Sequence, residues 1–507
     1  MPESFSEDEK VLLSRYVTNV DRSIYALGNL PEEVVAVLFA YYSRSTESLR
    51  RNLLKLLREQ EVDLDRRLQW IEQDSGALAE AKEKARQFHE KWVVGYGHSS
   101  VAEHAVIHLA LEDVSILATK IIEDNRLASY TEKSTRYVIF DPHGYYTPPR
   151  LQASPCGEIY QRTVTSLLSC YHTLMEGTIA AIQARWPRQE GQAEGAYKAA
   201  CRAKSCDILR YLLPAATQTN LGLTINGRAL ESMISKLLSH PLEEIREIGE
   251  SMKGEAQKIV PTLIKYAAPN PYRMETERVM REMAQEFAGA ETPKEDRTVR
   301  LVAAPSDAEK RLVAAILYPY GSSSYAQLME RVSLLSPEEK ERIIDEYLKR
   351  RGPHDQPLRA LEDVVYTFEI LVDFGAFRDI QRHRMATQHL QEFSADHGYV
   401  LPGEAAELGL ETEFHSSMEM ARDAYSEIHK RHPLEAAYVL PLAYRRRVLF
   451  TWNLREMFHF VQLRSARQGH TSYRSVAQEV YRELERVQPL LARYMRVDLE
   501  KYPLGRL

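Results

Sequence analysis

The sequence predicts an α+β protein that contains two tandem copies of one domain. At 507 residues the chain is longer than a single hydrophobic core usually supports. Each half contains an apolar, β-like run, at residues 105–111 and 364–371. Each run is followed by a long helical region, which leads to a Leu-Pro pair and then to an Asn-x-Arg triplet. The same features in the same order in both halves indicate an internal repeat.

The repeat is most regular near the end of each copy. Leu213-Pro214 and Leu440-Pro441 both precede an Asn-x-Arg triplet, and Leu and Asn are thirteen residues apart in each case. A polar stretch separates the two halves and predicts a linker between them. The expected division is residues 1–275 for the first domain, 276–294 for the linker and 295–507 for the second domain.

Several helices are expected from their capping residues. Ser336 is a good N-cap, and it is followed by Pro337 and two glutamates, which favour the first turn of a helix. Pro31 and Pro241 also precede acidic residues and indicate helix starts. Residues 50–95 are rich in Leu, Arg, Glu and Lys, which predicts a pair of amphipathic helices with a charged face in water.

Composition limits the classes of function. The chain is 44% hydrophobic and 27% charged, with a net charge of −6, so a broad, basic nucleic-acid surface is not expected. Any anion site has to be a local cluster of arginines. No apolar run approaches the roughly 20 residues of a membrane span. The acidic start lacks the features of a signal peptide, so we expect a cytoplasmic protein. The four cysteines show no paired metal spacing and are expected to be reduced: Cys156, Cys170, Cys201 and Cys206.

Two clusters of polar residues are candidates for chemistry. Arg382-His383-Arg384 contains two arginines, whose planar guanidinium groups are always charged, on either side of an imidazole. This combination is typical of a phosphate or diphosphate site. Ser134 and Arg136 are two residues apart, and in an extended segment both would point to the same side and grip one phosphate. Taken alone, each cluster can also be an ordinary surface feature. No metal is expected, because the spacing of four histidines fits no familiar site: His354, His383, His389 and His397.

The two clusters lie in stretches that look like halves of one split motif. Residues 381–394 keep an Arg-His-Arg head, and residues 124–137 keep a Glu-x-Ser-x-Arg-Tyr tail. Together they resemble the signature of the flavin-dependent thymidylate synthase family, which reads Arg-His-Arg, seven residues, then Ser-x-Arg-Tyr. The resemblance implies two tandem domains of that family, each a small, mainly antiparallel sheet flanked by long helices. It also implies that one complete site forms where the two copies face each other.

In that family the residues of each site come from several chains. The resemblance implies that here they come from the two copies instead. The phosphate side survives in the first copy, whereas the second copy has Ala437 where the first has Arg210. The second copy keeps Arg464, implied to lie near the uracil ring and to promote ionisation at N3, where the first copy has Leu237. The implied substrate contacts are Glu132, Ser134, Arg136, Arg210, Arg382 and Arg464. The implied flavin contacts are Arg382, His383, Arg384, Asn453, Arg455, His459, His98 and Ser100.

The resemblance implies a reaction and an assembly. The family transfers a methylene group from methylenetetrahydrofolate to C5 of dUMP and reduces it with hydride that FAD receives from NADPH, without a cysteine nucleophile. Because the family forms tetramers, two of these chains are expected to pair as a homodimer of four domains. Two other functions stay open. One is a flavin enzyme that uses another pyrimidine nucleotide or another one-carbon donor. The other is a non-catalytic flavin- or nucleotide-binding paralogue with a structural or regulatory role.

The composite site makes two structural demands. Arg136 and Arg382 have to lie near each other, and no carboxylate should occupy the space between them. The reciprocal site would pair residues 124–126 with residues 392–394. Asp124 would place negative charge where a phosphate should lie, as would a glutamate in the partner stretch, so the reciprocal site is expected not to bind anions.

Overall fold

The structure is a computed structural model, which describes residues 4–30, 32–42, 45–59, 101–287 and 297–502. Contacts between residues divide the chain into two compact units, each of which is built from separate segments. Unit 1 comprises residues 1–112, 127–132 and 220–289. Unit 2 comprises residues 113–126, 133–219 and 290–507, so it combines segments from both sequence halves.

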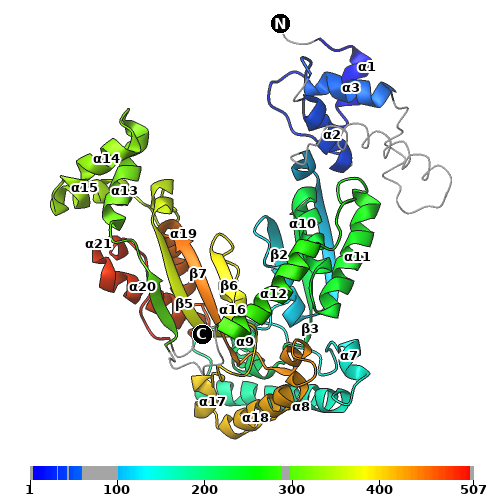
Figure 1. Cartoon of the computed structure of the whole chain (residues 1–507), viewed down its shortest axis with the longest axis vertical. Coiled ribbons are helices and arrows are strands. Elements are labelled where there is room, and N and C mark those ends of the chain that lie inside the picture. Colours follow the sequence, from blue (N-terminus) through cyan, green and yellow to red (C-terminus); the bar gives the residue numbers. More distant parts are fainter. Residues whose placement is uncertain (1–3, 31, 43–44, 60–100, 288–296, 503–507) are drawn as a thin grey trace. The chain divides into compact units, whose positions relative to one another are not determined.

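Unit 1 begins with three short helices (Figure 1), α1 Glu7–Leu13, α2 Glu32–Tyr42 and α3 Leu49–Glu59. The side chain of Ser6 accepts a hydrogen bond from the Glu9 backbone, and the Glu9 side chain accepts one from the Ser6 backbone, which forms a capping box at α1. Leu13 and Leu53 are completely buried in the small core between these helices. α2 confirms the helix start predicted at Pro31, whereas most of the predicted helix pair at 50–95 lies outside the described residues.

Unit 1 also holds most of a three-stranded sheet in the order β1-β3-β2. The strands are β1 Val106–Ser115, β2 Ala128–Glu132 and β3 Gln218–Asn226, and β2 pairs antiparallel with β3. Leu221, Leu223 and Ile225 alternate with more exposed residues along β3, which is the pattern of a sheet with one buried face. The 3-10 turn η2 Val101–His104 precedes β1, and the helices α10 Gly227–Leu238, α11 Glu243–Ile259 and α12 Pro271–Phe287 follow β3.

Unit 2 contains a four-stranded antiparallel sheet in the order β4-β5-β7-β6 (Figure 1). Its strands are β4 Val299–Ala303, β5 Val365–Asp373, β6 Thr387–Leu390 and β7 Arg445–Asn453. The two central strands are in register from Val365, opposite Asn453, to Asp373, opposite Arg445. β5 confirms the strand predicted at 364–371, and the two small antiparallel sheets confirm the α+β fold class.

Unit 2 also contains many helices, and α15 begins where the sequence indicated. Ser336 forms a capping box with Glu339 at α15, as predicted. From the first sequence half come α6 Ile116–Ile122, α7 Pro149–Gln152, α8 Gly157–Arg185, α9 Glu194–Leu209 and η3 Arg210–Leu212. From the second half come α13 Ala308–Leu317, η4 Tyr318–Tyr320, α14 Tyr325–Ser333, α15 Pro337–Leu348, η5 Arg359–Asp363, α16 Phe374–Ile380, α17 Gly403–Glu407, α18 Glu411–His429, η6 Glu435–Val439, α19 Leu454–Ser465, α20 Thr471–Val487 and α21 Pro489–Ala492.

The two Leu-Pro pairs of the repeat lie side by side inside unit 2. Pro214 forms an antiparallel bridge with Pro441. The backbone N–H of Ala215 donates to the carbonyl of Leu440, and the N–H of Leu442 donates to the carbonyl of Leu213, both at 2.9 Å. Because proline has no N–H, the residue after each proline supplies the donor and the residue before it supplies the acceptor. The repeated motif is therefore one of the places where the two sequence halves join.

Equivalent positions of the repeat also have equivalent local structures. Asn226 caps the N-terminus of α10 by accepting from the Ala229 backbone, and Asn453 caps α19 by accepting from the Glu456 backbone. The domain boundaries inferred from the repeat stay a prediction, and α12 runs through part of the predicted linker. Within the described ranges, no helix has the length and apolar character needed to cross a membrane.

The matched caps predict equal effects on stability. Asn226→Ala and Asn453→Ala should each lower the free energy of unfolding by about 1 kcal/mol, because each removes the side-chain acceptor of a helix N-terminus. Chemical denaturation of the two variants measures this. A loss at Asn453 that greatly exceeds the loss at Asn226 would show that Asn453 does more than cap its helix.

Candidate functional site

Unit 2 brings together the arginines that the split motif singled out in the two sequence halves. Burial lowers the pKa of Arg464. The negative charge of Asp379 opposes this effect, and the positive charges of Arg382 and Arg136 add to it. Arg136 and Arg382 therefore both lie close enough to Arg464 to act on it electrostatically. Within unit 2, cations from both copies therefore lie near Arg464, while the proximity of Arg136 to Arg382 stays a prediction.

Arg136 is buried and already holds a carboxylate. Its Nε and Nη2 donate to the two carboxylate oxygens of Asp207 at 2.7 and 3.0 Å, and its Nη1 donates to the Tyr473 hydroxyl at 2.7 Å. Burial lowers the pKa of Arg136, but the hydrogen bond and charge of Asp207 outweigh burial and raise it overall. Burial likewise raises the pKa of Asp207, and Arg136 outweighs it, so this carboxyl stays ionised.

The segment around Arg136 corrects one expectation. Ser134 and Arg136 were expected in an extended segment with both side chains on one side, but β2 ends at Glu132 and the backbone then forms a turn. The N–H of Val138 donates to the carbonyl of Ser134 at 3.1 Å, and the Ser134 hydroxyl accepts from the Arg136 backbone. The turn directs Arg136 into the interior, where Asp207 compensates its charge.

Arg210 is the most deeply buried of these arginines, with 1% of its surface exposed. Its Nη1 lies 3.7 Å from a carboxylate oxygen of Asp379. Its Nε and Nη2 have no hydrogen-bond partner among the described residues. These two nitrogens form one edge of the guanidinium group and lie against Gly375, which has no side chain that could offer an acceptor. A buried donor edge without an acceptor costs free energy, unless a ligand or water supplies the acceptor.

His383 connects Arg464 to a glutamate. The Nε of Arg464 donates to Nε2 of His383 at 3.0 Å, and Nδ1 of His383 lies 2.8 Å from Glu456. Because Nε2 accepts, the proton of a neutral imidazole is on Nδ1, where it donates to Glu456. Burial lowers the pKa of His383 to about 4, although the hydrogen bond to Glu456 raises it. His383 is therefore a neutral link that orients Arg464.

Asp379 lies between arginines of the two copies. Its carboxylate oxygens are 3.7 Å from Nη1 of Arg210 and 3.9 Å from Nη1 of Arg464. Both distances exceed that of a hydrogen bond, so the contacts are electrostatic rather than tightly bonded. The charge of Asp379 also acts on Arg136. A carboxylate therefore lies inside the cationic cluster, next to Arg210 and Arg464, and whether one lies between Arg136 and Arg382 stays a prediction.

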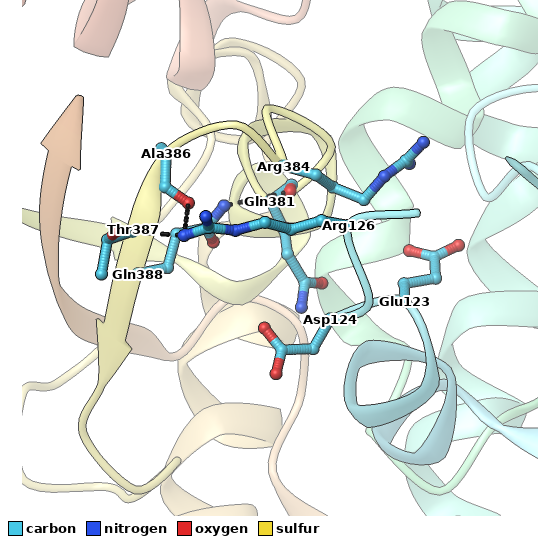
Figure 2. Close-up of a pocket in the computed structure, with 8 residues that line it drawn as sticks. All are labelled: Glu123, Asp124, Arg126, Gln381, Arg384, Ala386, Thr387 and Gln388. Carbon is cyan, nitrogen blue, oxygen red and sulfur yellow. Dashed lines mark hydrogen bonds between the residues drawn. The ribbon is translucent and has the colours of Figure 1, made fainter. Parts of the chain in front are cut away.

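A polar pocket of about 200 Å³ lies next to the Arg-His-Arg segment within unit 2 (Figure 2). Arg126 extends across it and donates to the Thr387 hydroxyl at 3.0 Å. The side-chain oxygens of Gln381 and Gln388 have no hydrogen-bond partner in the described part of the chain. The pocket is lined by Glu123, Asp124, Arg126, Gln381, Arg384, Ala386, Thr387 and Gln388. It therefore presents donors and acceptors from both copies.

The pocket adjoins the reciprocal site that was expected not to bind anions. Burial lowers the pKa of Arg446 to about 10, and Asp124 opposes that effect, so the two charges lie near each other. The cation–π contact of Arg446 with the Phe377 ring, 5.3 Å from its centroid, holds the arginine in place. Whether anions bind there stays a prediction.

Several implied flavin contacts have partners within their own copy. Asn453 caps α19, and Arg455 donates to Glu362 and to the carbonyl of Pro357, both at 2.7 Å. The His459 ring lies 5.3 Å from the His383 ring, and Arg382 is exposed. Glu132 belongs to unit 1, at the end of β2. The remaining two implied contacts, His98 and Ser100, lie outside the described residues.

Sequence reasoning missed the acidic partners of the site. Asp207 lies three residues before Arg210, and Asp379 lies three residues before Arg382, so each acidic residue is about one turn from an implied ligand. That spacing was a detectable signal. Glu456 directly follows the Asn-x-Arg triplet and carried no such signal, because its partner His383 is distant in sequence.

The state of His383 predicts a pH dependence of stability. Below its ordinary pKa of 6.5 the unfolded chain binds a proton at His383, whereas the folded protein does not until about pH 4. Unfolding is therefore favoured progressively as pH falls through this window, by roughly 3 kcal/mol at most. Denaturation of wild type and His383→Gln between pH 7 and pH 4.5 measures this, with the exposed His389→Gln as control. If His383→Gln keeps the full wild-type slope, His383 is not the buried neutral imidazole described.

Comparison with known proteins bears on these features. The model of the thymidylate synthase complementing protein family matches residues 42–262 and 300–490. A UPF0159 protein of Chlamydia pneumoniae is 36% identical over 522 residues, covering all of this chain and 97% of that protein. A flavin-dependent thymidylate synthase of Clostridium tetani is 28% identical over 38% of this chain and 73% of its own length.

A crystal structure of the flavin-dependent thymidylate synthase of Helicobacter pylori, complexed with FAD and dUMP, aligns with 39% of this chain and all of its own. The sequence identity is 17% and the TM-score 0.31. Because the family model matches over two segments that together span most of the sequence, the chain belongs to the thymidylate synthase complementing protein family, that of the flavin-dependent thymidylate synthases.

Proposed function

We propose that this protein methylates dUMP to dTMP, with methylenetetrahydrofolate as carbon donor and reduced FAD as reductant, at one composite site per chain. One observation carries the proposal. In unit 2, Arg210 of the first copy and Arg464 of the second share the carboxylate of Asp379, and Nε and Nη2 of Arg210 lack an acceptor within the described structure. A phosphate monoester supplies two oxygens in the geometry that this planar fork binds best.

The phosphate side of the site comes from the first copy. Arg210 binds the phosphate directly through its unpaired edge. The nitrogens of Arg136 are bonded to Asp207 and Tyr473, so Arg136 acts through its charge and by keeping Asp207 in place. Ser134 completes this side by analogy with the family motif.

The base side comes from the second copy. Arg464 faces the uracil and stabilises the negative charge that develops when N3 ionises, which raises the electron density at C5. His383 and Glu456 hold the Arg464 guanidinium in one orientation, so little reorganisation is needed during the reaction. A preorganised donor of this kind is worth about 3 kcal/mol in the transition state.

The residues beside the Arg-His-Arg segment fit a flavin dinucleotide. Arg382 and Arg384 match a diphosphate, and the unpaired oxygens of Gln381 and Gln388 match N–H groups of a heterocycle. His459 borders the same region. When bound, FAD supplies the hydride that reduces the transferred carbon, with NADPH as the source of electrons. Asn453 and Arg455 support the fold of this region rather than adding free donors.

The proposed assembly is a homodimer. Two chains would supply four family domains and two composite sites, which matches the tetramer expected from the family. Light scattering should then give about twice the 58.3 kDa mass of one chain. A cytoplasmic location, NADPH and the folate donor are part of the same proposal.

A specific observation favours a second candidate, a paralogue that binds a flavin or nucleotide without this catalysis or that accepts another pyrimidine nucleotide. Asp207 and Asp379 already compensate part of the positive charge that a phosphate would meet. A yellow purified protein with a flavin spectrum argues against a role without flavin. Release of tritium from C5-labelled dUMP, dependent on methylenetetrahydrofolate and NADPH, separates thymidylate synthesis from an altered substrate.

The two sides of the site predict different kinetic effects. Arg464→Ala should lower kcat about 100-fold with a smaller change in KM, because the interaction acts in the transition state. Arg210→Ala should mainly raise KM for dUMP, because the phosphate interaction acts in both ground and transition states. Arg467→Ala, an exposed arginine three residues from Arg464, is the matched control and should leave both constants near wild type. Identical effects of Arg464→Ala and Arg210→Ala on KM alone would contradict the assigned roles.

A further inference from the structure

We propose that Asp379 sets the ligand selectivity of the composite site, because its carboxylate is an internal counter-ion that competes with the anionic group of a bound nucleotide. The inference rests on the proposed function, since it concerns the same cluster of arginines. It adds a residue that neither the split motif nor the family resemblance assigned. It also predicts a direction of effect opposite to that of an ordinary binding residue.

The position of Asp379 carries the proposal. The carboxylate lies between Nη1 of Arg210 and Nη1 of Arg464, at 3.7 and 3.9 Å. These two arginines come from different copies and define the two sides of the site. Asp379 reaches neither at hydrogen-bond distance, so it neutralises both without satisfying either. An anion that bound both arginines at normal distances would have to displace or share this carboxylate.

The contrast with Asp207 identifies Asp379 as the replaceable carboxylate. Asp207 makes two hydrogen bonds to Arg136 with the parallel geometry of a strong ion pair. Asp379 makes none to the arginines, and its side chain is 15% exposed. Asp207 is a fixed part of the framework, whereas the contacts of Asp379 to Arg210 and Arg464 are loose enough to be exchanged for those of a ligand.

The packing of Arg210 against helix α16 explains why some of its hydrogen-bond donors have no acceptor. Gly375 and Asp379 are four residues apart in α16 and therefore lie on the same face of the helix. Arg210 packs along this face, with Nη1 towards Asp379 and its other two nitrogens over Gly375. Because Gly375 has no side chain, those nitrogens meet no acceptor in the part of the chain that the structure describes. Asp379 compensates the charge of Arg210 but leaves its donors unused.

The test compares a nucleotide with its nucleoside. Calorimetry should show that Asp379→Asn tightens binding of dUMP by about tenfold or more, because a like charge next to the phosphate has been removed. Binding of deoxyuridine, which lacks the phosphate, should stay within about twofold of wild type. Glu369→Gln is the matched control, since it removes a partly buried carboxylate that pairs with Arg447 at 2.9 Å elsewhere in unit 2. It should change neither affinity.

A purely structural Asp379 gives the opposite result. In that case Asp379→Asn would loosen Arg210 and Arg464 and weaken dUMP binding or leave it unchanged, which would overturn the proposal. Asp379→Gln provides a second variant that keeps a polar side chain, in case the asparagine variant does not fold. Tighter dUMP binding by either folded variant supports competition.

Failure of the proposed function can be distinguished from failure of this inference. If neither wild type nor the variants bind dUMP, the nucleotide assignment is wrong, and inorganic phosphate and pyrophosphate become the probes in a thermal unfolding assay. A larger rise in Tm with either anion for Asp379→Asn than for wild type and Glu369→Gln then still supports the inference. An equal or smaller rise overturns it.

Discussion

Burying several positive charges in one place is the constraint on which the site depends. Removing a guanidinium from water costs several kcal/mol unless nearby negative charge and hydrogen-bond acceptors replace the solvent. Arg136 satisfies this requirement completely, through Asp207 and Tyr473. Arg210 does so only in part, because Asp379 supplies charge without a hydrogen bond. The cluster is thus held together by its carboxylates, yet one edge of the Arg210 guanidinium has no acceptor in the described part of the chain.

The two sequence halves have equivalent backbone features at matching positions, but they carry different side chains at the positions that form the site. The Leu-Pro pairs of the two halves bond reciprocally, and each Asn-x-Arg asparagine caps the helix that follows. Additional buried bonds join the halves, including Arg378 to the Thr135 hydroxyl and Gln381 to the Lys120 carbonyl. This symmetric framework fixes where side chains from the two halves meet, and the divergent side chains then create one cationic site.

The repeating elements were predictable because they depend on local interactions. The capping residues at Ser336 and the apolar run at 364–371 specify a helix start and a strand regardless of what surrounds them. The turn after Glu132 was not predictable in this way. Its backbone could have continued as a strand, and the ion pair of Arg136 with Asp207, 71 residues away, is formed inside the fold. Tertiary contact outweighed the local preference there.

The sequence alone determined the family of the chain, because the residue types and spacing of the two half-motifs limit which proteins can share them. Only the tertiary structure decided how the charges of the arginines are compensated. Asp379 is close to Arg382 in sequence, but its contacts with Arg210 and Arg464 exist only once α16, η3 and α19 are packed together. The link from Glu456 through His383 to Arg464 arises in the same way, because electrostatic and hydrogen-bonding partners are set by distance in space rather than by separation along the chain.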